Sequence, residues 1–407
     1  MPPRERKRNP AAQRNMEMLE ARRNKQIGDK STHSNGKSSI LLTHILSFVS
    51  IIRSFFLSLL TPDRFWIILF VPSFIQYMHL LRTSLKPHPL TIGSVIDIHG
   101  GLTPLLDMNS KIEVVAEGLD GMLEAPLWRH DPDLGRGYLL FSQVEFNRLW
   151  RWEEGGGAFT IGRSLFLEHA GCHDRILNAL KLKDSTCSSI RNSGVRDMSL
   201  PPSIDGALQP IILCEGGHQR ISRLEANGTR TPIASWTQSD SDCSVTLDKE
   251  GGMYYTSSTD EGRCITYQPS LSTSEGSLTI KKDLTSSAHL ALSPCEKFLY
   301  VAEGSLGHVH WTVYRLGNTS SEPPVTFSSS LSLVEPGGMA VDIKRNLYAA
   351  CGEEGVLVMD SAGTPLGTIS TGGLKATDVA LGPDGILYIT TKGSVLRVPT
   401  KSALSKT

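Results

Sequence analysis

Near the C-terminus, Leu387-Tyr388-Ile389-Thr390 is followed, after a short turn, by Ser394-Val395-Leu396-Arg397-Val398. The first run is mostly apolar, the second alternates between polar and apolar residues, and aromatic and β-branched residues are frequent. This pattern predicts two β-strands joined as a hairpin. Similar pairs of runs occur five more times upstream, with first strands that begin at Tyr138, Ile211, Met253, Leu299 and Leu347.

The regular recurrence of this hairpin predicts the architecture. A β-unit repeated every roughly 40 to 50 residues is typical of a propeller or a solenoid. Propeller blades carry four strands, so we expect two further strands before each hairpin. Six copies therefore predict an all-β chain with a closed six-bladed β-propeller over residues 112–398. The wider spacing between the first and second copies predicts an insertion at about 164–208.

The residues before the propeller differ sharply in composition. Residues 1–37 contain ten Lys or Arg and four Asp or Glu, and we expect a disordered, basic cytosolic tail. Residues 38–82 are strongly apolar and predict a membrane anchor, formed by one transmembrane helix or by a helical hairpin. Residues 83–111 are expected to form a linker, and residues 399–407 a C-terminal tail.

The number of membrane spans stays open. The run from Ser39 to Leu60 contains His44 and Arg53, whereas the cleaner run from Phe65 to Leu81 has only about 17 residues, near the lower limit for a span. One span would place the propeller in a lumen or outside the cell, and two would return it to the cytosol. We therefore expect a location in an endomembrane or the plasma membrane, with the side of the propeller undecided.

Charge and cysteine content argue against several classes of function and site. The chain has 41 basic and 41 acidic residues, so it offers no overall field for nucleic acid, and no nucleic-acid partner is expected. Seven cysteines without paired spacing do not indicate a disulfide framework or a zinc site. Cys214, Cys264 and Cys351 fall on strand patterns and are expected to be small core residues.

The order of several motifs resembles that of a known family. These motifs are Glu124-Ala125-Pro126-Leu127-Trp128, the strand Asn147-Arg148-Leu149-Trp150-Arg151-Trp152, the turn that begins at Cys214, and Pro336-Gly337-Gly338-Met339. Together they resemble the gluconolactonase family, which includes the senescence marker protein regucalcin and the luciferin-regenerating enzyme. The resemblance implies a six-bladed propeller and calcium- or zinc-dependent hydrolysis of sugar lactones or related esters.

The resemblance also implies a metal site. In such chemistry a divalent ion on the propeller axis polarises the lactone carbonyl and lowers the pKa of a bound water. Of four ligand positions implied by the family, Glu124 retains its residue, while the others align with Cys243, Ala288 and Gly337. Neighbouring residues that could substitute are Asp242, His289 and Glu335. A set of Glu124, Asp242, His289 and Cys243 would suit Zn²⁺ or another transition metal better than Ca²⁺.

Three functional hypotheses follow. The first is a membrane-anchored, gluconolactonase-like hydrolase with a degenerate metal site that binds Ca²⁺, another divalent metal or none, and acts on a small lactone or ester. The second is a non-catalytic propeller used for binding or as a scaffold. The third is a condensing enzyme similar to strictosidine synthase. Enzymatic activity itself stays open at this point.

Overall fold

A computed structural model of the chain describes residues 90–154, 163–168, 194–202, 207–236, 242–259, 262–284, 288–305, 308–316, 325–330, 337–382 and 385–401. These residues belong to a compact unit that spans 87–407. The predicted tail (1–37) and the predicted membrane anchor (38–82) lie outside the described residues. Within the described residues, no helix is long and apolar enough to cross a membrane. The prediction of a membrane location is corrected on that finding.

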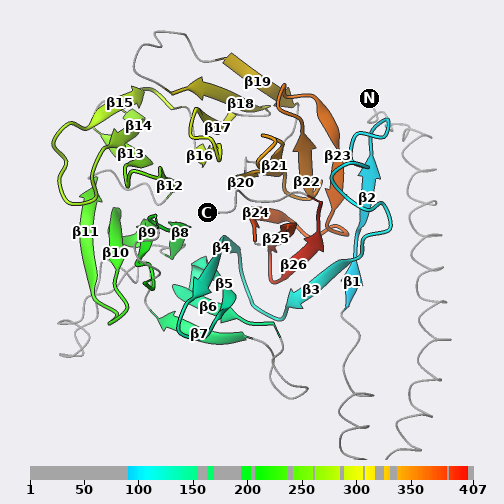
Figure 1. The fold of residues 1–407 in the computed structure, drawn as a ribbon, viewed down its shortest axis with the longest axis horizontal. Coiled ribbons are helices and arrows are strands. Elements are labelled where there is room, and N and C mark those ends of the chain that lie inside the picture. The colour runs from blue at the N-terminus through cyan, green and yellow to red at the C-terminus, as the bar shows by residue number, and fades with distance from the viewer. Residues whose placement is uncertain are drawn as a thin grey trace, which may run out of the picture. The chain divides into compact units, whose positions relative to one another are not determined.

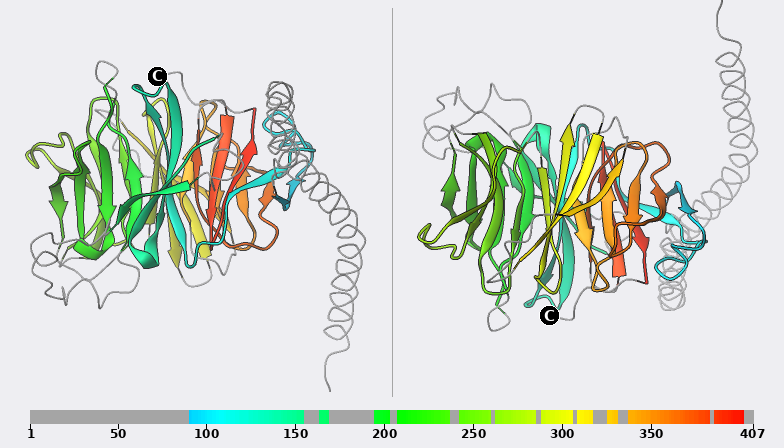
Figure 2. Two further views of the ribbon diagram at one scale, coloured as in Figure 1. Left: turned by 90° about the horizontal axis from the view of Figure 1, so that it is seen from below. Right: turned by 90° about the horizontal axis from the view of Figure 1, so that it is seen from above.

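The described residues form six antiparallel sheets arranged in a ring around a central axis (Figure 1). In the side views, the strands of the blades run between the two faces of the ring (Figure 2). The predicted six-bladed all-β propeller is therefore confirmed. Each sheet is one blade, and the strands nearest the axis are β4, β8, β12, β16, β20 and β24 (Figure 1).

The blades follow the chain in order. Blade 1 contains β4 (Leu123–Asp131), β5 (Arg136–Gln143), β6 (Arg148–Trp152) and β7 (Arg163–Glu168). Blade 2 contains β8 (Val195–Ser199), β9 (Ile211–Glu215), β10 (Arg220–Leu224) and β11 (Arg230–Ser235). Blade 3 contains β12 (Val245–Leu247), β13 (Met253–Thr259), β14 (Gly262–Gln268) and β15 (Leu278–Lys281). Blade 4 contains β16 (Ala288–Leu292), β17 (Phe298–Ser305), β18 (His308–Arg315) and β19 (Val325–Ser330).

The last two blades have five strands each. Blade 5 contains β20 (Met339–Val341), β21 (Leu347–Ala350), β22 (Val356–Met359), β23 (Pro365–Ser370) and β2 (Ser94–Asp97). Blade 6 contains β24 (Ala376–Leu381), β25 (Ile386–Thr391), β26 (Val395–Pro399), β3 (Ile112–Ala116) and β1 (Thr91–Ile92). Two one-turn 3₁₀ helices, Val144–Phe146 and Gly216–His218, lie in the turns after β5 and β9.

The recurring hairpin has a different place in the blade from the one expected. In every blade it forms the second and third strands, as in β5–β6 and β25–β26, so one strand precedes it and one follows it. The expectation of two preceding strands was wrong. Two of the inner strands, β12 and β20, have only three residues each and carry little periodic signal.

Strands from the two ends of the propeller sequence close the ring. β3 pairs antiparallel with β26, so the first part of the domain completes the last blade. β1 and β2, which lie in the segment predicted as a linker, extend blades 6 and 5. The segment predicted as an insertion, about 164–208, includes most of β7 and all of β8.

The hydrophobic core is divided into clusters that lie between neighbouring blades. Tyr300 of blade 4 packs with residues of blade 5, such as Leu347. Tyr388 of blade 6 packs with Leu139 and Phe141 of blade 1. Both tyrosines are about 1% exposed. Since each aromatic ring fills the gap to the next blade, the same residue type recurs in the second strand of several blades.

Candidate site in the central channel

A cavity of about 190 Å³ lies on the axis of the propeller. Residues of all six inner strands, or residues directly before them, line it. Its polar lining includes Asp197, Ser244, His289 and Asp378. The cavity is therefore the place where side chains from different blades meet.

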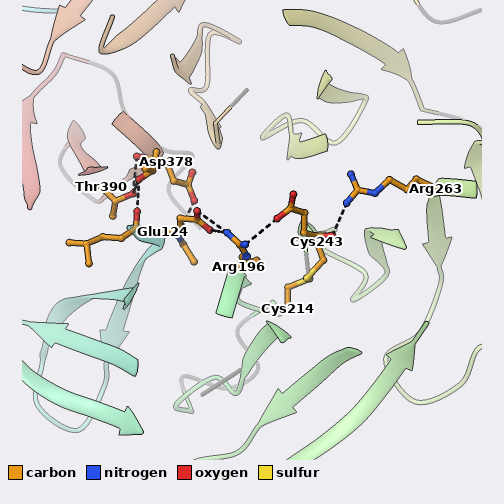
Figure 3. A network of polar contacts seen from close by, with 11 residues as sticks. Glu124, Arg196, Cys214, Cys243, Arg263, Asp378 and Thr390 are labelled. Atoms are coloured by element: carbon orange, nitrogen blue, oxygen red, sulfur yellow. Dashed lines mark hydrogen bonds and ion pairs between the residues drawn. A yellow bond between two sulfur atoms is a disulfide. The ribbon is translucent and has the colours of Figure 1, made fainter. Parts of the chain in front are cut away.

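A buried ion pair lies beside this cavity. Arg196 on β8 donates from Nη1 to both carboxylate oxygens of Glu124 on β4, at 3.0 Å each (Figure 3). Both residues are less than 10% exposed. Nη2 of Arg196 also lies 3.2 Å from Oδ1 of Asp242, whose side chain is 42% exposed. The guanidinium therefore bridges a buried carboxylate and a half-exposed one.

Burial and the guanidinium act in opposite directions on Glu124. Burial raises the pKa of Glu124 above its usual value, while the charge of Arg196 and its hydrogen bonds lower it. The nearby negative charge of Asp242 raises it further. Removing a carboxylate from water is costly unless a partner compensates. Arg196 is that partner here, and Glu124 depends on it.

Asp197, the residue after Arg196, joins blade 2 to blade 3. Its Oδ2 accepts hydrogen bonds from Ser244 Oγ at 2.6 Å and from the Val245 amide at 2.9 Å, and its Oδ1 accepts one from the Met198 amide. Burial raises the pKa of Asp197 to about 6, although these three hydrogen bonds lower it. Ser244 Oγ in turn accepts a hydrogen bond from the Leu290 amide, which extends the connection to blade 4.

Asp378 has the corresponding role between blades 6 and 1. Its Oδ2 accepts a hydrogen bond from the Ala125 amide at 3.0 Å, and its Oδ1 accepts one from the Val379 amide at 2.7 Å. Burial and then the charge of Asp197 raise the pKa of Asp378 well above its usual value. A Cβ placed on Gly338 would lie 1.5 Å from Oδ1 of Asp378, so only glycine leaves room for this carboxyl group.

His289 on β16 lines the cavity beside these groups. Burial lowers the pKa of its imidazole to about 4, and the positive charges of Arg196 and Arg263 lower it as well, while Asp242 raises it. The imidazole is therefore neutral at physiological pH. A neutral imidazole presents one hydrogen-bond donor and one acceptor.

Cys243 is part of a disulfide with Cys214. Cys214 lies on β9 of blade 2, and Cys243 lies just before β12 of blade 3, so the bond joins neighbouring blades. The cysteine spacing did not indicate this bond, whereas Cys214 is a buried core residue as expected. A disulfide sulfur is not a thiolate, and metal binding by cysteine requires the thiolate. The residues on either side, Asp242 and Ser244, contact Arg196 and Asp197 respectively.

The residues of the channel do not fit a calcium site. Both oxygens of Glu124 are engaged by Arg196, and Ca²⁺ needs six to eight oxygen ligands. Ala288 has no ligand atom in its side chain, and a Cβ on Gly337 would lie 2.5 Å from the Thr377 carbonyl oxygen, so no longer side chain fits there. Across the described part of the chain, no three His, Cys, Asp or Glu residues are grouped so that they could hold a metal ion.

The residues predicted for the site are only partly brought together. Glu124 and Asp242 both contact Arg196, and the imidazole of His289 senses the charges of Asp242 and Arg196. Cys243 is in the disulfide, and Glu335 lies outside the described residues. Sequence reasoning missed Arg196, Asp197 and Asp378 as site residues. The run Val195-Arg196-Asp197-Met198-Ser199 shows no alternation of apolar and polar residues, and it lies in the segment predicted as an insertion.

Comparison with known proteins agrees with this fold. Residues 123–393 match the family described as the SMP-30/gluconolactonase/LRE-like region. Among curated proteins, no sequence matches the chain. A gluconolactonase from Xanthomonas campestris is similar in structure, with 18% identity, a TM-score of 0.58, and coverage of 77% of this chain and 99% of that one.

Two other solved structures share the fold. One is a calcium-binding protein, regucalcin, from Agrobacterium tumefaciens, with 13% identity, a TM-score of 0.50, and coverage of 72% of this chain and 97% of that one. The other is an aldose sugar dehydrogenase from Streptomyces coelicolor in its PQQ-bound form, with 14% identity, a TM-score of 0.52, and coverage of 77% and 100%. At these identities the structures demonstrate a shared fold alone. The family match spans most of the propeller, and the chain belongs to the SMP-30/gluconolactonase/LRE-like family.

Proposed function

We propose that this propeller binds a small, uncharged, hydroxyl-bearing molecule of the sugar-lactone class in its channel, and that the guanidinium of Arg196 takes the place of a divalent metal. One observation carries the proposal: Nη1 of Arg196 is hydrogen-bonded to both oxygens of Glu124. Glu124 is the ligand position that the family resemblance retains. Its carboxylate already has a cationic partner supplied by the chain itself.

Repulsion between positive charges disfavours the binding of a metal ion next to Arg196. At an effective dielectric constant of about 20, the repulsion between the guanidinium and a unit positive charge about 4 Å away is about 4 kcal/mol. A divalent ion meets about twice that repulsion. It would also have to displace the hydrogen bonds of Arg196 from a buried carboxylate. Since these costs fall on a site with few other ligands, we expect no tight Ca²⁺ binding.

The lining of the cavity favours an uncharged ligand. An anion would meet the carboxyl groups of Asp197 and Asp378, which line the same cavity. These carboxyl groups already accept hydrogen bonds from neighbouring strands, so they are not set up to hold a cation. Hydroxyl and carbonyl groups, by contrast, can pair with the neutral imidazole of His289.

The test is an assay of D-glucono-1,5-lactone hydrolysis by the full chain, with added Ca²⁺ and with a chelator, beside calorimetric binding of the same lactone. We expect binding, and no hydrolysis that depends on added Ca²⁺. Rapid hydrolysis that disappears with the chelator would refute the proposal, because it would require a metal bound despite Arg196. Arg223→Ala is the control for an arginine substitution on blade 2, since Arg223 pairs with Glu225 at an exposed position.

A second candidate is lactone or ester hydrolysis without a metal. It is favoured by Asp197, which lines the cavity and has a pKa raised to about 6, in the range useful for general acid–base catalysis. Three hydrogen bonds to its oxygens place this candidate second. Hydrolysis that withstands the chelator and is lost in Asp197→Asn would support it over simple binding.

A further inference from the structure

The channel is lined by two rings of side chains. Successive residues of a strand point to opposite faces, so residues two apart along an inner strand share one face of it. The upper ring consists of Asp197, Ser244, His289, Gly338 and Asp378. The lower ring lies two residues further along each strand and consists of Ser199, Thr246, Ala291, Ala340 and Ala380. The side chains of the lower ring are small, and Ala291 and Ala340 also pack against core clusters between blades.

Most polar groups of the upper ring already have hydrogen-bond partners. Asp197 accepts three hydrogen bonds. Ser244 donates to Asp197 and accepts from the Leu290 amide. Asp378 accepts from two backbone amides. These contacts hold neighbouring inner strands together and leave little capacity for a ligand.

His289 is the exception in this ring. Its imidazole makes no hydrogen bond within the described part of the chain, although it lines the cavity. It is a neutral group at physiological pH, because burial and two neighbouring arginines disfavour the charged form. It therefore offers one donor and one acceptor to whatever enters the channel. The charges of Asp242, Arg196 and Arg263 act on its imidazole, and Asp197 and Asp378 line the same cavity.

We propose that His289 is the specificity-determining residue of the channel, and that its imidazole pairs with a hydroxyl or carbonyl group of an uncharged ligand whose ring lies against the small side chains of the lower ring. This inference rests on the proposed binding function and adds the residue that selects the ligand. The role is one of recognition: ligands that carry a net charge are disfavoured, and ligands without a hydrogen-bonding group are not held.

The experiment measures calorimetric binding of 1,5-anhydro-D-glucitol, a stable uncharged cyclic polyol, to the full chain and its variants. We expect His289→Leu to weaken binding about tenfold, the factor that corresponds to a free energy of about 1.4 kcal/mol. His289→Gln keeps a donor and an acceptor and should stay within about threefold of the wild-type affinity. His130→Leu is the matched control, because His130 is an exposed residue of β4 outside the cavity lining. Gluconate, the charged probe, should bind more weakly than the polyol.

A second variant separates the two proposals. Ala380→Leu places a larger side chain in the cavity lining and should abolish binding if the channel is the site. Loss of binding in Ala380→Leu with unchanged affinity in His289→Leu would overturn the role of His289 and leave channel binding intact. Binding that both variants retain would place the site elsewhere, and a wild-type chain that binds neither probe would overturn both proposals. Circular dichroism of each variant checks its fold, and His289→Asn replaces His289→Leu if the latter does not fold, with the same loss expected from its shorter side chain.

Discussion

At two interfaces between neighbouring blades, called seams below, an aspartate of one inner strand accepts a hydrogen bond from the next blade. The residues around the two aspartates differ. At the blade 2–3 seam, Asp197 is the third residue of the inner strand and accepts a hydrogen bond from the Val245 amide of the next blade. At the blade 6–1 seam, Asp378 is also the third residue of its inner strand and accepts one from the Ala125 amide. The repeated aspartate shows that this clamp belongs to the architecture of the propeller.

The residue before each aspartate is where the seams differ. At the blade 6–1 seam it is Thr377, whose hydroxyl donates to the Leu123 carbonyl oxygen and lies 3.0 Å from the hydroxyl oxygen of Thr390. At the blade 2–3 seam it is Arg196, which contacts Asp242 and reaches across to Glu124 of blade 1. The blade 2–3 seam also carries the disulfide. The comparison separates what holds the ring together from what is specific to the channel: the aspartates do the first, and Arg196 does the second.

The largest effect should come from Arg196→Met. Removing one partner of a buried ion pair leaves the other charge uncompensated and typically costs about 3–5 kcal/mol of unfolding free energy. Thr377→Val, the equivalent change at the other seam, removes only neutral hydrogen bonds and should cost roughly 1–3 kcal/mol. Urea unfolding of both variants measures the difference. Equal losses would mean that Arg196 is simply another clamp.

The disulfide should make the second largest contribution. It closes a loop with a sequence separation of 29 residues, for which the loss of unfolded-state entropy corresponds to roughly 3–4 kcal/mol. The double variant Cys214→Ala/Cys243→Ala should lower the urea midpoint accordingly. Treatment with a reductant should then have no further effect on it. A double variant as stable as the wild type would show that the blade 2–3 seam does not depend on the bond.

The two aspartates should give stability a distinctive pH dependence. The pKa of Asp197 is about 6 in the folded chain, against an ordinary value of 3.8, so between these values the folded state binds more protons than the unfolded state. This group therefore favours folding most at the acidic end, and its contribution falls as pH rises from about 4 to about 6. The change is on the order of 2–3 kcal/mol, from about two pKa units.

Asp197→Asn is the variant that reveals this contribution. Its stability relative to the wild type should improve as pH rises through the same window, when unfolding is measured at several pH values. A difference between wild type and variant that does not change with pH would contradict the raised pKa.

The smallest effect should come from Gly338→Ala at the blade 6–1 seam. The new Cβ would occupy the position of Asp378 Oδ1, so the carboxyl group must turn away and lose its two backbone hydrogen bonds. At about 0.5–1.5 kcal/mol for each hydrogen bond, we expect a loss of roughly 1–3 kcal/mol. Gly100→Ala is the control, because a Cβ there meets no atom within 4 Å. Any loss of stability in this variant therefore comes mainly from backbone strain. A Gly338→Ala chain as stable as that control would mean that Asp378 does not need its present position.

The hairpins could be predicted because their strands are rich in aromatic and β-branched residues and recur in the same order along the chain. The inner strands were not predicted. Two of them, β12 and β20, have three residues each, and a segment of that length is too short to show a periodic pattern. Glu124 was found through the resemblance to a family. Arg196 could not be found in this way, because its contacts to Glu124 and Asp242 span 72 and 46 residues of sequence. These contacts form only once the ring has closed.

The disulfide was missed for a related reason. Cys214 and Cys243 lie in different blades, and neither has a neighbouring cysteine whose spacing suggests a pair. Their bond depends on how blade 2 faces blade 3, and the packing between blades sets that geometry. Likewise, the missing space at Gly337 is due to the Thr377 carbonyl of the adjacent blade, which no local pattern reports.

The most direct test of the role given to Arg196 is a calorimetric titration of the wild-type chain with Ca²⁺. With Glu124 held by the guanidinium, we predict no saturable binding at Ca²⁺ concentrations up to about 10⁻³ M, the range of weak extracellular calcium sites. One ion bound per chain with a dissociation constant below about 10⁻⁴ M, and lost in Glu124→Gln, would contradict the account. It would mean that Arg196 gives way to a metal and that the ancestral ligand still works.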